Sequence, residues 1–102
     1  VFNSRGSCFA AIIISDKLMK GVVHMSTGAW YDPVNPREAS PCKNGNPNVL
    51  TPDKGTSRLG QGPIAHTCLV EVRRLTKPIP EVTAYSPPKI IKAKTNSRYR
   101  EK

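Results

Sequence analysis

Residues 44–62 constrain the fold of this chain more than any other stretch. The run reads NGNPNVLTPDKGTSRLGQG, and among its nineteen residues only Val49, Leu50 and Leu59 are strongly apolar. Asn and Gly tolerate left-handed backbone, and Asn, Thr and Ser carry short hydrogen-bonding side chains. The run is too polar for a core element, so it predicts a loop that wraps a polar ligand. We expect a phosphorylated ligand, because residues 55–57 are typical of a helix start, whose free N–H groups bind anions.

The rest of the chain favours short strands joined by long loops. Ten prolines and seven glycines in 102 residues indicate a loop-rich, mainly β domain. Apolar and alternating runs predict strands over 8–14, 22–25 and 67–74, and the end of another strand over 1–3 before a turn at 4–6. The pattern also predicts a long loop over 26–47 and a short helix over 56–61, ended by Gly62 and Pro63.

The cysteines do not indicate a metal site. Cys8, Cys42 and Cys68 are odd in number and lack the close spacing of zinc or iron–sulfur ligands. We interpret them as buried or half-buried free thiols of a reducing compartment, which favours the cytoplasm over the periplasm. No apolar run approaches the ~20 residues that span a bilayer, so we expect no membrane partner.

The positive charge is concentrated at the C-terminal end. Of the net charge of +9, residues 87–102 contribute +5, and they contain few apolar side chains. We therefore divide the chain into a domain over 1–82 and a basic, flexible tail over 83–102. The alternative is a small basic β protein that binds nucleic acid through this tail. The sequence holds no nucleic-acid-binding motif, and Tyr99 is the only aromatic residue between 87 and 102.

Four blocks of sequence together resemble a known family. They are residues 1–6 (VFNSRG), 26–33 (STGAWYDP), 45–62 and 67–72 (TCLVEV). In this order they are similar to the C-terminal cofactor-binding domain of the molybdopterin-dependent S- and N-oxide reductases, which act on dimethyl sulfoxide, trimethylamine N-oxide or biotin sulfoxide. The resemblance covers about residues 1–88, and residues 83–88 lean toward the biotin sulfoxide branch.

The resemblance implies a fold, a cofactor and a partner. The fold is a double-psi β-barrel with long loops and one or two short helices, and here it is incomplete because its first strands are missing. The cofactor is a bis-molybdopterin guanine dinucleotide carrying molybdenum, bound jointly with the remainder of the enzyme chain. We expect an oxidoreductase that reduces S- or N-oxides by oxygen-atom transfer. The present chain holds neither the metal ligand nor any catalytic residue, and it cannot catalyse the reaction alone.

The resemblance also implies a set of cofactor-binding residues. Asn48 and Thr51 occupy positions that bind the pterin or a phosphate, followed by Asn46, Ser57 and Gln61. Asn and Gln amides match the donors and acceptors along a pterin edge. Asn48 could instead be a turn residue.

Two further residues have open roles. Asp53 either accepts a ligand N–H or caps the short helix. Trp30 either lines the cofactor site or anchors the long loop. Two positions depart from the family pattern, with Asn44 where His is common and His66 where Gln is common.

Overall fold

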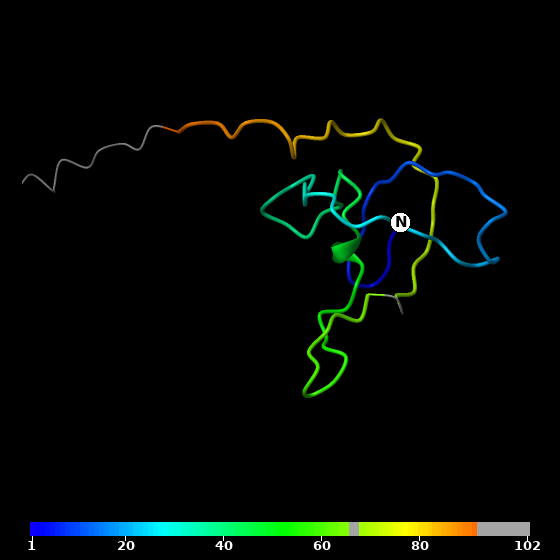
Figure 1. Ribbon diagram of the computed structural model, residues 1–102. Helices are drawn as coiled ribbons and strands as arrows, with labels where there is room; N and C mark the ends of the chain where they lie inside the picture. Colours follow the sequence, from blue (N-terminus) through cyan, green and yellow to red (C-terminus); the bar gives the residue numbers. More distant parts are fainter. Residues whose placement is uncertain (66–67, 92–102) are drawn as a thin grey trace, which may run out of the picture.

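A computed structural model describes residues 1–65 and 68–91, and its single helix lies near the middle of the body (Figure 1). This helix, η1, is a 3-10 turn over Pro47–Val49. The Asn46 side chain accepts a hydrogen bond of 2.9 Å from the N–H of Asn48, and Pro47 fills a helix-start position that needs no N–H donor. The N–H of Leu50 bonds the Pro47 carbonyl at 3.0 Å and closes the turn. The Asn-Pro-Asn sequence is thus sufficient to explain this helix.

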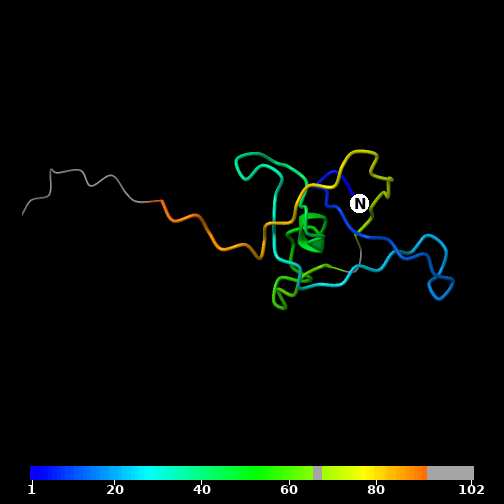
Figure 2. The same cartoon turned by 90° about the horizontal axis from the view of Figure 1, so that it is seen from above.

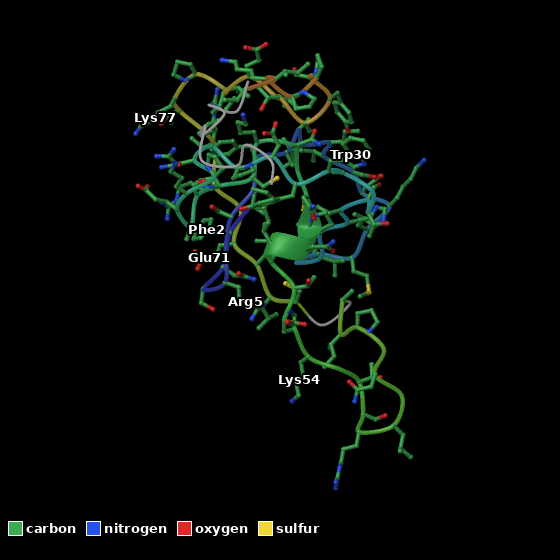
Figure 3. All side chains as sticks on the ribbon, turned by 90° about the vertical axis from the view of Figure 1, so that its left-hand side faces the viewer. Phe2, Arg5, Trp30, Lys54, Glu71 and Lys77 are labelled. Carbon is green, nitrogen blue, oxygen red and sulfur yellow. The ribbon has the colours of Figure 1, made fainter. Side chains whose placement is uncertain are left out.

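Five short segments pair side by side in place of a regular sheet. Isolated bridges join Phe2 with Ser7 and with Glu71, Cys8 with Cys42, and Pro33 with Cys42. The Cys8–Cys42 bridge is parallel and the others are antiparallel. Phe2 and Glu71 exchange both backbone hydrogen bonds, at 2.9 and 2.8 Å, and Figure 3 shows the two residues next to each other. The pairing agrees with a mainly β domain.

The turn predicted at residues 4–6 is confirmed. The side-chain oxygen of Asn3 accepts from the N–H groups of Arg5 and Gly6, at 2.9 and 3.2 Å. Gly6 is required here because a Cβ at this position would lie 2.5 Å from the carbonyl oxygen of Val49. The turn therefore packs directly on the end of η1.

The buried core is small. Cys8, Cys42 and Leu50 are buried, with Val1, Met25, Val49, Cys68 and Val70 packed around them. The predicted burial of the thiols is confirmed for Cys8 and Cys42, and Cys68 is half-buried. Burial raises the pKa of the Cys8 thiol.

Two predicted strands are wrong as regular strands. Among the described residues, 8–14 pairs only at its start, through the Cys8–Cys42 bridge and a hydrogen bond of 2.9 Å from the Phe9 N–H to the Cys42 carbonyl. Ile13 and Ile14 are consequently 90% and 92% exposed. Residues 22–25 form no ladder with any described residue. Their start is a turn in which the N–H of Val22 bonds the Met19 carbonyl at 3.1 Å.

The predicted helix over 56–61 is also wrong. The N–H of Thr56 bonds the Gly62 carbonyl at 2.8 Å, so the segment forms a closed loop. Gln61 has φ of 43°, outside the helical region, and Leu59 is 97% exposed. Without an apolar face to pack, a helix of this length has too few hydrogen bonds to form.

The segments extend far from the core. Figure 1 shows the loop 53–63 projecting from the body, and Figures 1 and 2 show the same for residues 10–22 and the extended stretch 80–91. The radius of gyration is 19.2 Å, against about 13 Å for a compact domain of 100 residues. His66 and residues 92–102 lie outside the described residues, and so does Thr67, the first residue of the strand predicted over 67–74. In the described part of that predicted strand, Glu71 forms the bridge to Phe2.

Candidate functional site

Three of the predicted cofactor-binding residues lie together around η1. The oxygen of Asn46 is engaged in capping the turn, while the exposed side-chain amide of Asn48 bonds no other described residue. The Thr51 hydroxyl donates to the Asn48 carbonyl at 3.3 Å. Asn48 and Thr51 therefore form one polar surface at the end of the turn, with the Asn48 donors and acceptor open to a ligand.

A pocket of about 300 Å³ adjoins this surface. Thr51 lies in its wall, together with Pro47 and Leu50 from the same turn. His24 and Met25 line the pocket from the segment 22–25, and the remaining walls are mostly apolar. The pocket thus combines an apolar interior with a polar edge, as small-molecule sites in proteins commonly do.

The other loop residues lie on the projecting loop 53–63. An antiparallel bridge between Gly55 and Pro63 closes its base. Asp53, Lys54 and Gln61 line a second, shallow pocket there. Because the described residues after Asp53 form no helix, its predicted capping role is wrong.

Ser57 and Gln61 are partly engaged within the projecting loop. The Ser57 hydroxyl accepts a hydrogen bond of 2.7 Å from the N–H of Gly60. The side-chain nitrogen of Gln61 donates to the carbonyls of Ser57 and Arg58, at 3.1 and 3.2 Å. The side-chain oxygen of Gln61 accepts no hydrogen bond from the described residues, so it can accept one from a ligand.

Trp30 lies away from the projecting loop 53–63 but is connected to the start of the polar loop 44–62. Figure 3 shows Trp30 and Lys54 on opposite sides of η1. The Asn44 side chain donates to the Trp30 carbonyl at 3.0 Å and to the Tyr85 hydroxyl at 3.4 Å. The Trp30 and Tyr85 rings have centroids 5.6 Å apart and are tilted by 37°. Asn44, two residues before the capping Asn46, thus joins the aromatic pair to the polar loop.

Asp32 forms a polar cluster with Lys43, Thr83 and Ala84. Its side chain is buried and accepts hydrogen bonds from the N–H and hydroxyl of Thr83 and from the N–H of Ala84. The ammonium of Lys43 lies 3.2 Å from it. Burial raises the pKa of Asp32, but the hydrogen bonds from Thr83, Lys43 and Ala84 outweigh this effect and hold the pKa below its ordinary value.

Sequence reasoning missed Asp32, Lys43, Tyr85 and Lys54. Asp32 stands within the GAWYDP block, and its neighbour Pro33 is typical of a turn, so the pattern carried no sign of a buried carboxylate. Its partners Thr83 and Ala84 are about fifty residues away in the sequence. Only the fold brings them together. Among residues 1–65 and 68–91, no three His, Cys, Asp or Glu residues lie close enough to hold a metal ion.

The described part of the chain contains no helix long and apolar enough to cross a membrane. Residues 83–85, placed in the tail by composition, contact Asp32, Asn44 and Trp30 as given above. The domain boundary at residue 82 stays a prediction.

Comparison with known proteins gives one consistent family. The sequence model of the molydopterin dinucleotide binding domain family matches residues 1–69. The chain is 48% identical over 89 residues to a trimethylamine-N-oxide reductase of Salmonella typhi, covering 86% of this chain and 10% of the relative. It is 46% identical over 89 residues to trimethylamine-N-oxide reductase 1 of Escherichia coli O157:H7, with the same coverage.

A more distant relative extends the same pattern. The trimethylamine-N-oxide reductase of Vibrio parahaemolyticus is 41% identical over 88 residues, which are 86% of this chain and 11% of the relative. The chain thus spans about a tenth of the length of the curated relatives it matches. These matches give no support to a small nucleic-acid-binding protein.

Proposed function

This chain belongs to the molydopterin dinucleotide binding domain family, and on that premise we propose that its loop 44–62 binds the pterin and dinucleotide groups of such a cofactor in a larger oxidoreductase. The observation that carries the proposal is the side chain of Asn48. It is exposed, and its amide bonds no other described residue. The Asn48 carbonyl accepts from the hydroxyl of Thr51, which lines the apolar pocket. An amide offers both donors and an acceptor to a pterin edge.

The side chains of loop 44–62 suit a molybdopterin dinucleotide. Thr51 supplies a hydroxyl in the wall of the pocket, where a fused ring could lie against the apolar lining, and Asn48 supplies an exposed amide from the adjoining turn. Asp53, Gln61 and Lys54 surround the second pocket, and the Lys54 ammonium suits a phosphate. Asn46 and Ser57 each stabilise a turn by accepting a backbone hydrogen bond, and their other polar atoms are offered to the cofactor. We propose that Trp30 packs at the edge of the same site.

The proposed enzyme reduces S- or N-oxides. The curated relatives are trimethylamine-N-oxide reductases, which supports an oxide as the substrate class. When bound, a molybdenum-loaded bis-molybdopterin guanine dinucleotide supplies the oxygen-atom transfer chemistry. The residues of this chain orient and enclose the cofactor, and the rest of the enzyme shares in binding it. Residues 1–82 form the binding domain in this proposal, and residues 83–102 form the basic extension.

The exposed apolar surface supports a role within a longer chain. Ile12, Ile13 and Ile14 are 72%, 90% and 92% exposed, although such residues are usually buried. We propose that the rest of the enzyme covers this run and that the paired segments complete a double-psi β-barrel there. On this basis, the 102-residue chain expressed alone aggregates or unfolds gradually. A monomeric chain with a sharp two-state melt would contradict the proposed cover.

The test of the cofactor site uses the full-length enzyme that carries this domain, here called the parent enzyme. We expect Asn48→Ala to lower bound pterin and molybdenum, because the amide hydrogen bonds are lost within a buried complex, at a cost of about 1–3 kcal/mol. Arg37→Ala is the matched control, since Arg37 is exposed and its side chain bonds no other described residue. Equal pterin and molybdenum contents in the two variants would refute the assignment of Asn48.

A further inference from the structure

The carboxylate of Asp32 holds Thr83 and Ala84 onto the loop over 26–47. One oxygen accepts from the N–H groups of Thr83 and Ala84, at 2.5 and 2.9 Å. The other accepts from the Thr83 hydroxyl at 2.8 Å and lies 3.2 Å from the Lys43 ammonium. Lys43 also donates to the Thr83 hydroxyl at 2.9 Å. We call this set of four residues the Asp32 anchor.

The cluster is built for a charged carboxylate. Asp32 is 6% exposed, and both of its oxygens face donors only. Burial of a carboxylate is costly unless its oxygens are hydrogen-bonded and its charge is paired. Here the nearby ammonium and the backbone donors meet both conditions. An amide at this position would point an NH₂ group at one set of donors, so Asn is not an equivalent residue.

The anchor determines where Tyr85 lies. Tyr85 follows the two anchored residues directly, and its ring contacts Trp30 with centroids 5.6 Å apart. This distance is within the range of favourable aromatic pairs. Asn44 bonds both partners, through the Trp30 carbonyl and the Tyr85 hydroxyl. Trp30 is 63% exposed, and the Tyr85 ring is its aromatic partner among the described residues.

We propose that Asp32 is a positioning residue of the cofactor site, acting through residues 83–85 to hold Tyr85 against Trp30. The anchor thereby sets the orientation of the Trp30 ring and of Asn44 beside the polar loop. The part of this inference that concerns the cofactor rests on the proposed function. The structural part, that Asp32 controls the Trp30–Tyr85 contact, is independent of it.

The first experiment tests the structural part in the parent enzyme. The enzyme is labelled with 5-fluorotryptophan, and the ¹⁹F resonance of Trp30 is assigned by its loss in Trp30→Phe. We expect Tyr85→Leu and Asp32→Asn to move this resonance to similar positions, because each removes the tyrosine ring from Trp30. Asp16→Asn is the matched control, since Asp16 is exposed on another segment. A resonance that moves in Tyr85→Leu but stays in place in Asp32→Asn would refute the anchor.

The second experiment follows the loss of pterin from the same variants during dialysis. We expect Asp32→Asn and Tyr85→Leu to lose pterin roughly threefold to tenfold faster than the wild type, the range of effect of one or two buried hydrogen bonds. The double variant should lose it no faster than either single variant, because both changes act through one contact. A merely structural role for Asp32 would instead give additive effects.

A milder variant keeps the inference testable if Asp32→Asn fails to fold. Thr83→Val removes one hydroxyl donor and leaves the two backbone donors in place, so we expect a smaller shift in the same direction. The two proposals also fail differently. A wild-type enzyme without pterin refutes the proposed function and the role of the anchor in it. A pterin-loaded enzyme whose loss rate is unchanged in Asp32→Asn refutes the positioning role alone.

Discussion

The side chain of Arg5 donates a hydrogen bond of 2.6 Å from Nε to the carbonyl of Leu50, forty-five residues further along the chain. The same carbonyl accepts from the Asn3 amide at 2.8 Å and from the Cys68 thiol at 3.0 Å. Three segments therefore meet at one carbonyl, at the point where η1 ends. Because Thr51 follows directly, this junction holds the proposed cofactor loop against the N-terminal turn.

The Arg5 contact gives a first prediction. Arg5→Ala in the parent enzyme should lower the stability of this domain by about 1 kcal/mol, a reduced value for a charged hydrogen bond because Arg5 is exposed. The Leu50 carbonyl keeps its two other donors, so the domain should still fold. Urea-dependent proteolysis of the domain measures the change, with Arg37→Ala as the control. An Arg5→Ala variant as resistant as the control would show that the contact adds nothing.

The role of Asn46 can be separated into capping and ligand binding. Asn46→Ala removes the cap of η1 and should cost about 1 kcal/mol of stability. Asn46→Asp keeps the oxygen that accepts from the Asn48 N–H, so it should retain stability while losing the amide donor. Comparing urea resistance with pterin content distinguishes the two roles. If Asn46→Asp also keeps full pterin content, Asn46 acts as a cap and not as a cofactor ligand.

The low pKa of Asp32 predicts an acid-sensitive anchor. Because the pKa of Asp32 is lower in the folded protein, the charged carboxylate stabilises the fold. This contribution to the free energy of unfolding is fully present above the ordinary Asp pKa of about 3.9. It is lost as the pH falls through the lowered pKa of the folded protein. The titratable groups that face Asp32 are the Lys43 ammonium, 3.2 Å from the carboxylate, and the Cys42 thiol, whose sulfur accepts from the Asp32 N–H at 3.5 Å. The Trp30 ¹⁹F resonance should therefore shift on acidification in the wild type. An identical acid transition in Asp32→Asn would contradict this origin.

Two truncations of the parent enzyme separate the anchor from the basic extension. Ending the chain after Ser86 keeps Thr83, Ala84 and Tyr85, and it should leave pterin content unchanged. Ending it after Val82 removes all three and should lower pterin content as Tyr85→Leu does. The first truncation also removes most of the C-terminal positive charge, so unchanged heparin binding would show that the tail is not a polyanion site. Equal pterin loss in both truncations would place the important residues beyond 86.

The local features were predictable because they depend on residues that are neighbours in the sequence. The turn at 4–6, the burial of Cys8 at the start of its apolar run, and the irregular path of loop 44–62 all follow from local composition. Asn46, Asn48 and Thr51 are close together for the same reason. The family was also recognisable, since four blocks in one order are carried by the sequence alone.

The predicted strands and helix failed for a different reason. An apolar, β-branched run such as 8–14 becomes a strand only when another segment lies alongside it, and the described residues provide such a partner only at its start. The helix expected at 56–61 likewise lacked an apolar surface to pack against, as the exposure of Leu59 shows. The strand and helix propensities of these segments were read correctly, but neither element forms because no other described segment packs against it.

The sequence by itself determined the composition of the polar loop, the Asn-Pro-Asn turn and membership of the family. Only the tertiary structure decided that the Arg5 side chain meets the Leu50 carbonyl, that Asp32 is buried, and that Tyr85 lies on Trp30. The physical reason is the range of the interactions. Backbone dihedral preferences and capping act over a few residues, whereas a buried carboxylate needs donors that the chain must bring from about fifty residues away.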